Sequence, residues 1–224
     1  MIKAILFDLD NTLLDRDASV LAFISNQYDR LQSSLNGVNK QTYVKRFVEL
    51  DNHGYVWKDE VYRQLIEEFE LGMTWEAMLD DYVREFRHSC VPYPNLHAML
   101  ENVRKRSIQL GMITNGYGQF QLNNIKALQI DHLFEAILIS EWEGVKKPNA
   151  SIFEKALNRM GVEPHESVFV GDHPVNDVAA AKSVGMTAVW KRNATFSESA
   201  EADYTIDGLD EIGSVLENCR QIYV

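Results

Sequence analysis

The chain has 224 residues, of which 46% are hydrophobic and 25% are charged, a composition typical of soluble globular proteins. Its formal net charge of −11 repels nucleic acid and anionic lipid, so neither is expected as a partner. Apolar runs long enough for a signal peptide or a membrane span are missing, and the two cysteines are expected to be reduced. These features favour a cytoplasmic protein.

The first expected element is an apolar segment at residues 2–7. It is short and a polar turn follows it, which is typical of a fully buried strand in a parallel sheet. Between about residues 17 and 88 the apolar side chains recur at helical spacing instead, in four groups at 20–35, 43–50, 61–69 and 75–86. Asp17 or Ser19 is the expected N-cap of the first helix and Thr74 that of the fourth. Four amphipathic helices predict a small helical bundle inserted after the first strand.

After this insert, strand and helix patterns alternate. Further short apolar segments occur at residues 108–113, 136–139, 167–170, 187–190 and 204–206. Helical patterns separate several of them, at residues 117–128, 151–160 and 175–184. This alternation predicts a Rossmann-like α/β fold, an open and mostly parallel sheet with right-handed crossovers. We therefore expect an α/β core domain formed by residues 1–15 and 93–224, and a helical cap domain formed by residues 16–92.

Polar residues cluster directly after four of the predicted strands. Because ligands bind at the carboxyl ends of strands in open α/β sheets, these residues are the candidates for a functional site. They are Asp8, Asp10 and Thr12 after the first strand, Thr114, Asn115 and Gly116 after the second, Lys147 beyond the third, and Gly171, Asp172 and Asp177 after the fourth.

The carboxylates in this set predict a metal site. Asp8 and Asp10 are two residues apart, so in an extended segment they face the same side, and Asp172 brings a third acid. Carboxylates held close together repel one another unless a cation lies between them. A site of oxygen ligands alone suits a hard cation, and Mg²⁺ fits because it keeps water ligands that a phosphate oxygen can replace.

Each group of residues has an ordinary structural interpretation when it is taken alone. Asp8 and Asp10 lie in a turn-rich stretch, Thr114-Asn115-Gly116 is a common start of a helix, and an exposed lysine is usually only solvated. The functional interpretation rests on all four groups following successive strands in this order.

The four groups together resemble the motifs of the haloacid dehalogenase-like hydrolases, and the resemblance covers the whole chain. In order, the segments similar to the four motifs of that family are Asp8-Leu9-Asp10-Asn11-Thr12, Thr114-Asn115-Gly116, Lys147-Pro148, and Gly171-Asp172 with Asn176-Asp177. The helical insert is similar to the helical cap of the family.

The resemblance implies an Mg²⁺-dependent phosphatase that acts on a small phosphorylated metabolite. It implies that Asp8 is the nucleophile and a metal ligand, and that Asp172 is another ligand. It also implies that Asp10 protonates the leaving oxygen and then activates water, while its backbone carbonyl binds the metal.

The resemblance also assigns the remaining residues. Thr114 and the N–H of Asn115 are expected to hold the phosphoryl oxygens, and Lys147 to neutralise charge on them. Lys147 is preferred to Lys146 because the lysine of the family commonly lies next to a proline. Asp177 is expected to orient Lys147 or a metal-bound water, and Thr12 and Gly116 to lie just behind these groups.

Other activities of the family remain alternatives. A haloacid dehalogenase lacks the second aspartate of the first motif because halide leaves without a proton, whereas this chain keeps Asp10. A phosphomutase commonly has Glu-Asp where this chain has Gly171-Asp172. A catalytically silent module that binds an anionic ligand is the alternative from another class.

Substrate choice is expected to lie in the helical cap, which closes over the site of such enzymes and excludes water. The candidates there are Arg16, close to the hinge, and His53, in the Asn52-His53-Gly54 turn. A monomer and a homodimer are both compatible with the sequence.

Overall fold

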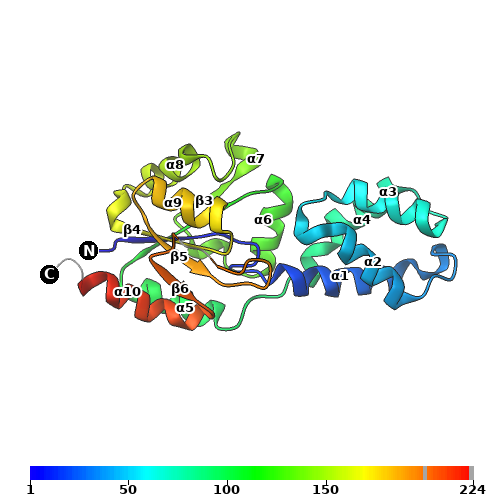
Figure 1. Cartoon of the computed structure of the whole chain (residues 1–224), viewed down its shortest axis with the longest axis horizontal. Coiled ribbons are helices and arrows are strands. Elements are labelled where there is room, and N and C mark those ends of the chain that lie inside the picture. The colour runs from blue at the N-terminus through cyan, green and yellow to red at the C-terminus, as the bar shows by residue number, and fades with distance from the viewer. Residues whose placement is uncertain (199–200, 222–224) are drawn as a thin grey trace. The chain divides into compact units, whose positions relative to one another are not determined.

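The computed structural model describes residues 1–198 and 201–221, and its contacts divide the chain into two compact units. One unit is formed by Met1–Asp15 together with the chain from Pro92 onward, and the other by Arg16–Val91 (Figure 1). Pro92, which the sequence places at the end of the helical segment, belongs to the first unit, where it forms an antiparallel bridge with Leu14. Among the described residues, the helices are all too short or too polar to cross a membrane.

The first unit contains a six-stranded sheet in which every pair of neighbouring strands is parallel, in the order β3-β2-β1-β4-β5-β6. The strands are β1 (Ala4–Phe7), β2 (Gln109–Thr114), β3 (Ala136–Ile139), β4 (Ser167–Gly171), β5 (Thr187–Lys191) and β6 (Tyr204–Ile206). This topology confirms the predicted Rossmann-like α/β fold. The apolar segments were sufficient to locate all six strands because strands buried on both faces carry continuous apolar runs.

The register of the sheet aligns the strand ends that carry the candidate residues. Phe7, the last residue of β1, pairs with Met112 of β2 on one side and with Val170 of β4 on the other. The chain continues this pairing one residue further, because the N–H of Asp8 donates to the carbonyl of Val170 at 2.9 Å. The residues that follow β1, β2 and β4 therefore emerge at one edge of the sheet.

Helices cover both faces of the sheet. Figure 1 shows α8 (Ala150–Met160) and α9 (Ala180–Ser183) on one face, with α5 (Leu96–Lys105) and α10 (Ile212–Gln221) on the other. Two more helices, α6 (Gly118–Ala127) and α7 (Ser140–Glu143), follow β2 and β3. The helix predicted at residues 175–184 begins instead as a π-helical segment, Pro174–Ala179, that continues into α9.

The core on the α8 face is formed by alternate residues of the central strands. Leu6 of β1 and Phe169 of β4 are buried in it with Phe153 of α8, and the rings of Phe153 and Phe169 pack edge to face with centroids 5.0 Å apart. Burial of one such side chain stabilises the fold by roughly 1.5–3 kcal/mol. The polar residues that follow these strands are thus supported by a densely packed hydrophobic core.

The second unit is the predicted helical bundle, inserted between β1 and β2. Its helices are α1 (Arg16–Leu31), α2 (Lys40–Asp51), α3 (Lys58–Phe69) and α4 (Trp75–Glu85). Thr74 caps α4 as predicted, accepting from the N–H of Ala77 at 3.3 Å. The predicted cap of α1 is wrong: the helix begins at Arg16, and Ser19 is buried within it, where its hydroxyl accepts from the N–H of Val91 at 2.8 Å.

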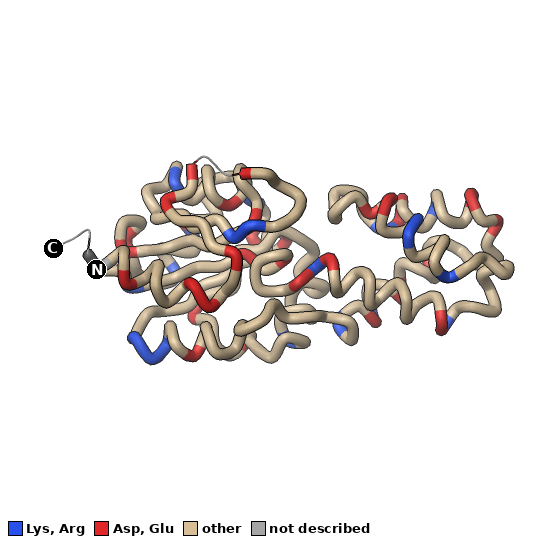
Figure 2. Tube along the Cα trace, turned by 60° about the horizontal axis from the view of Figure 1, so that its bottom comes forward, with Lys and Arg blue, Asp and Glu red and all other residues tan. Residues whose placement is uncertain are grey.

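A buried charge cluster lies inside this helical unit. Both oxygens of Asp51 accept hydrogen bonds from the guanidinium of Arg16, each at 2.9 Å, and the ammonium of Lys58 also donates to Asp51. Burial alone raises the pKa of Asp51, but the hydrogen bonds and charges of Arg16 and Lys58 outweigh it and hold this pKa below its usual value. Figure 2 shows that acidic and basic residues occur on both units.

Candidate active site

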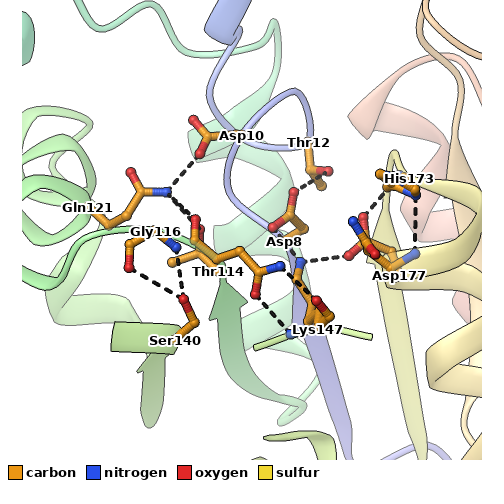
Figure 3. A network of polar contacts seen from close by, with 12 residues as sticks. Asp8, Asp10, Thr12, Thr114, Gly116, Gln121, Ser140, Lys147, His173 and Asp177 are labelled. Carbon is orange, nitrogen blue, oxygen red and sulfur yellow. Dashed lines mark hydrogen bonds and ion pairs between the residues drawn. The ribbon is translucent and has the colours of Figure 1, made fainter. Parts of the chain in front are cut away.

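The predicted site residues of the first unit converge at the carboxyl ends of β1, β2 and β4 (Figure 3). Lys147, from the loop between α7 and α8, lies at the centre of the cluster. Its Nζ atom is 2.6 Å from Oδ1 of Asp8 and 2.6 Å from Oδ1 of Asp177. Lys146 is exposed whereas Lys147 is buried, so the lysine next to the proline is the one that points into the cluster.

The charges around Lys147 keep it protonated. Burial lowers the pKa of the ammonium, but the negative charges of Asp177 and Asp8 and the hydrogen bonds to them outweigh burial, so the net shift is upward. Lys147 is therefore a fixed positive charge beside Asp8. An anionic group that approaches this carboxylate therefore meets the neutralising charge of Lys147.

Three carboxyl groups lie close together beside Lys147. Oxygens of Asp8, Asp172 and Asp177 all lie within 4.8 Å of one another. Burial raises the pKa of Asp8 to about 7 despite the opposing charge of Lys147, and burial with the charges of Asp177 and Asp8 raises the pKa of Asp172 to about 9. The cluster holds more negative charge than Lys147 can balance, so it favours a further cation.

Asp172 is held by two residues that sequence reasoning did not single out. The indole N–H of Trp190 donates to its backbone carbonyl at 2.7 Å, and the amide of Asn193 donates to its Oδ2 atom. Trp190 ends the predicted strand at 187–190, so it was counted only as an apolar strand residue. Together the two donors fix the direction in which the Asp172 carboxylate points.

Asp177 is oriented by both the chain and Lys147. Its Oδ2 atom accepts from the N–H of His173 at 3.0 Å, while Oδ1 accepts from Lys147. A Cβ atom added to Gly171 would lie 2.4 Å from Cβ of Asp177, so only glycine leaves room for the acid beside the end of β4. Both carboxylate oxygens are thus engaged, which suits the predicted role in orienting Lys147.

His173 caps the π-helical segment that carries Asp177. Its Nδ1 atom accepts from the N–H groups of Val175 and Asn176, each at 3.1 Å, and its ring packs on Phe196 with centroids 4.8 Å apart. Burial lowers the pKa of this imidazole, in keeping with a neutral ring that accepts hydrogen bonds.

Asp10 lies near this cluster but its carboxylate faces another partner. Its Oδ2 atom accepts from Nε2 of Gln121 at 2.7 Å, and the same nitrogen is 2.9 Å from the hydroxyl of Thr114 (Figure 3). Gln121 was not identified from the sequence. The sequence did contain an indication that Gln121 is buried. Gln121 and Asn124 lie on the same helical face as the buried Ile125 and as Leu128, which follows α6 directly.

Asn115 has a second function besides its backbone N–H. Its side-chain Nδ2 donates to the carbonyl of Lys147 at 3.0 Å, and its Oδ1 accepts from the N–H of Lys147 at 2.9 Å. Both polar groups of one amide are thereby used to hold the backbone of the loop that supplies the lysine.

Thr12 and Gly116 lie next to the predicted site residues. The hydroxyl of Thr12 is 3.5 Å from Oδ2 of Asp8. Gly116 has φ +148°, and a Cβ atom there would lie 2.8 Å from Cγ of Gln121, so its lack of a side chain makes space for Gln121. The N–H of Gly116 donates to the hydroxyl of Ser140 at 2.9 Å.

A buried lysine that the sequence did not indicate supports the turn after β1. The ammonium of Lys191 donates to the carbonyl of Asn11 at 3.3 Å and lies 3.3 Å from the ring centroid of Tyr93. Burial lowers the pKa of Lys191. Because Asn11 follows Asp10 directly, this lysine fixes the turn that carries Asp10.

The two substrate candidates of the helical unit differ in their surroundings. Arg16 has its guanidinium bound to both oxygens of Asp51, as described above. His53 is half-exposed, lies in the left-handed backbone region with φ +56°, and has its Nδ1 atom 4.0 Å from Oδ2 of Asp17. Arg16 is therefore committed to an ion pair within its own unit, and of the two His53 is the more accessible.

The chain is similar to known proteins over most of its length. The sequence model of the family described as haloacid dehalogenase-like hydrolases matches residues 5–191. A glyceraldehyde 3-phosphate phosphatase from Pyrococcus furiosus is 32% identical over 96% of this chain and 93% of its own length. A phosphoserine phosphatase from Thermus thermophilus is 32% identical over 70% of this chain and 64% of its own.

A solved structure has the same fold over almost the whole chain. A HAD phosphatase from Thermococcus onnurineus superposes with a TM-score of 0.68 and 31% sequence identity. The match covers 96% of this chain and 98% of the other.

Proposed function

This chain belongs to the haloacid dehalogenase-like hydrolase family, and on that basis we propose that it is an Mg²⁺-dependent phosphatase of a small phosphorylated metabolite. The two relatives described above are phosphatases by name, which supports a hydrolase of phosphomonoesters as the activity of this chain. The observation that carries the proposal is the buried ion pair between Lys147 and Asp8, which sets a carboxylate nucleophile beside a fixed positive charge.

The residues of the site fit a magnesium ion. Asp8 and Asp172 offer carboxylate oxygens, and the backbone carbonyl of Asp10 is the third proposed ligand. The raised pKa values of Asp8 and Asp172 support this set, because burial and the neighbouring carboxylates disfavour the ionised forms beyond what Lys147 offsets, and a bound cation would relieve that. When bound, the ion would supply a positive charge that offsets the repulsion between Asp8 and a phosphate.

The first chemical step proceeds at Asp8. One carboxylate oxygen forms a bond to phosphorus as the bond from phosphorus to the ester oxygen breaks, and Asp10 gives its proton to that oxygen so that the alcohol leaves. Lys147, the hydroxyl of Thr114 and the N–H of Asn115 neutralise the charge on the phosphoryl oxygens.

The second step returns the enzyme to its starting state. Asp10, now ionised, takes a proton from a water molecule, whose oxygen attacks phosphorus and breaks its bond to Asp8. Inorganic phosphate is released, Asp8 is ionised again and Asp10 is protonated again. The presence of Asp10 favours this chemistry over dehalogenation, in which the leaving halide needs no proton.

The helical unit, residues 16–91, is proposed to act as the cap that excludes water and selects the substrate. His53 is the favoured contact to the part of the substrate beyond the phosphate, because Arg16 is held by Asp51. Glyceraldehyde 3-phosphate is the first substrate to test, since it names the activity of a relative that matches over 93% of its own length. A cytoplasmic location, and a monomeric or homodimeric state, remain part of the proposal.

The test is inorganic phosphate released from a panel of phosphomonoesters, with Mg²⁺ and with a chelator, and with the Asp8→Asn variant beside the wild type. The panel contains glyceraldehyde 3-phosphate, phosphoserine, sugar phosphates, phosphoglycolate and nucleoside monophosphates. Release that requires Mg²⁺ and is lost in Asp8→Asn is the expected result. No release from any ester, or equal release with the chelator, would overturn the proposal.

A further inference from the structure

A buried glutamine connects the two sides of the candidate site. Gln121 lies in the first turn of α6 and is 2% exposed. Its Nε2 atom is 2.7 Å from Oδ2 of Asp10, 2.9 Å from the hydroxyl of Thr114 and 3.1 Å from the carbonyl of Asn115. One nitrogen therefore contacts the proposed acid and base, a proposed phosphoryl-binding hydroxyl and the backbone of the loop between them.

The surroundings determine which end of the amide faces Asp10. The carbonyl of Asn115 can only accept a hydrogen bond, so the amide atom that faces it must be the nitrogen. At the other end, Oε1 of Gln121 accepts from Nδ2 of Asn124 at 3.2 Å. Because Asn124 is itself buried in the same helix, the amide is held in one orientation from both ends.

This orientation decides where a proton resides on Asp10. An amide N–H donates and cannot accept, so Oδ2 of Asp10 acts as an acceptor toward Gln121. In a protonated carboxyl group the C=O oxygen is the better acceptor, so this hydrogen bond favours Oδ1, the other oxygen, as the carrier of the proton of Asp10. The hydroxyl of Thr114 also accepts from Gln121, at 2.9 Å, and itself donates to the carbonyl of Asn115 at 3.5 Å.

We propose that Gln121 is a positioning residue that directs the transferable proton of Asp10 to one carboxyl oxygen. The inference rests on the proposed phosphatase activity and adds to it a residue that the four motifs do not contain. Gly116 supports it, since a side chain there would displace Gln121, with a Cβ atom only 2.8 Å from Cγ of Gln121.

The role predicts a dependence on the leaving group. An alkoxide leaves poorly without a proton, whereas p-nitrophenolate leaves readily on its own, so only an alkyl ester needs the acid in the first step. The quantity to measure is kcat/KM, because it covers the steps up to departure of the leaving group and excludes the later hydrolysis of the aspartyl-phosphate.

The experiment compares kcat/KM for an alkyl phosphomonoester and for p-nitrophenyl phosphate, with Mg²⁺, in the wild type and in Gln121→Met. Methionine has a similar length and no N–H donor. For Gln121→Met we expect a loss of roughly 10–100-fold on the alkyl ester, since a positioned acid contributes at least that much, and a loss of less than about 3-fold on the aryl ester. The ratio of the two values is independent of the folded fraction, so a partly unfolded variant still gives an answer.

The matched control is Gln119→Met, on the same helix. Gln119 is exposed, and among the described residues its amide donates to Asn123, at 2.9 Å. For Gln119→Met, the ratio of the two kcat/KM values should equal that of the wild type. A second variant, Asn124→Leu, removes the donor to Oε1 of Gln121. It should shift the ratio in the same direction as Gln121→Met, but by less.

Equal losses on both esters, or no loss on either, in an active background would overturn the inference and leave the proposed function standing. A wild-type protein that releases phosphate from neither ester would overturn both.

Discussion

The side-chain amide of Asn115 pairs with the backbone of Lys147 through two hydrogen bonds, of 3.0 Å from its Nδ2 and 2.9 Å to its Oδ1. Asn115 follows β2 and Lys147 lies in the loop before α8, so the pair joins two segments that are 32 residues apart. The position of the buried ammonium therefore depends on an amide from a neighbouring strand end.

Replacing this amide by a carboxylate tests that dependence. Asn115→Asp cannot donate to the carbonyl of Lys147 and places a negative charge against it. We expect kcat to fall by roughly 10–100-fold, because small displacements of a catalytic group have effects of this size. Steady-state kinetics on the best phosphomonoester measures the change. An Asn115→Asp protein with the wild-type kcat would show that Lys147 is held in place by other contacts.

Lys147→Met should abolish most of the activity. The substitution removes the cation between Asp8 and Asp177, and we expect kcat to fall by roughly 10³-fold, the range found when a charge-stabilising donor is removed. Lys146→Met is the matched control, because Lys146 is its exposed neighbour in the same loop, and it should retain wild-type kinetics. If the two variants lost activity equally, the assignment of the lysine would be wrong.

Asp8→Asn should remove turnover while leaving the fold intact. The amide is nearly isosteric with the carboxylate but is not a nucleophile, and we expect kcat to fall by roughly 10⁴-fold or more. Circular dichroism and thermal melting of the same sample check that the fold is unchanged. Residual activity at the wild-type level, with the same dependence on metal, would exclude covalent catalysis at Asp8.

The acidic cluster predicts how magnesium binding varies with pH. The folded-state pKa values of Asp8 and Asp172, about 7 and about 9, lie above the ordinary value of 3.8. At pH values between the ordinary and the folded-state pKa of each group, the native state therefore binds more protons than the unfolded state. In chelator, the stabilising effect of these two groups is complete below about pH 4 and is lost as the pH rises through their folded pKa values.

Magnesium replaces those protons, so the rise in Tm on adding Mg²⁺ should be larger at about pH 8.5 than at about pH 6. Thermal melting at the two pH values, each with Mg²⁺ and with chelator, measures the difference. In Asp172→Asn the Mg²⁺ effect should be much smaller at both. A rise in Tm that is the same at both pH values in the wild type would argue against a metal site built on these acids.

The charge cluster of the helical unit predicts a stability effect. Asp51→Asn leaves Lys58, which is 1% exposed, without its carboxylate, and we expect a loss of about 3–5 kcal/mol in the free energy of unfolding. The control is Asp29→Asn, whose partner Lys40 lies at 2.6 Å in an exposed pair, and which should unfold at the wild-type denaturant concentration. Equal midpoints for the two variants would contradict the stabilising role of Asp51.

The strands and helices of this fold could be predicted because the apolar pattern that indicates each of them is local in the sequence. A buried parallel strand needs a continuous apolar run, and an amphipathic helix needs apolar residues at its own period, so the positions of β1 and α4 could be predicted without knowledge of their neighbours. The start of α1 could not, because Ser19 resembles an N-cap by its type alone. Its hydroxyl instead bonds to Val91, a residue far away in the sequence.

Candidate site residues could likewise be identified from the sequence where the signal was local, and were missed where it depended on partners brought together by folding. Asp8, Lys147 and Asp172 are ionisable and follow strands, so their type and position indicate them. Gln121 and Asn193 act through amides that are common on any surface, and their partners are fixed only when the chain has folded. The side-chain role of Asn115 was missed for this reason too, since its partner is a backbone group.

The bridge between Leu14 and Pro92 has a consequence for how such a protein can vary. The carbonyl of Leu13 also accepts from the N–H of Tyr93 at 3.0 Å, so the chain leaves the sheet unit and returns to it at one paired point. A segment that departs and re-enters there adds no strand and no crossover, and its length and sequence can change while the register of β1, β2 and β4 stays the same. If the proposed function holds, exchange of residues 16–91 would change the range of substrates while the residues of the reaction site stay the same.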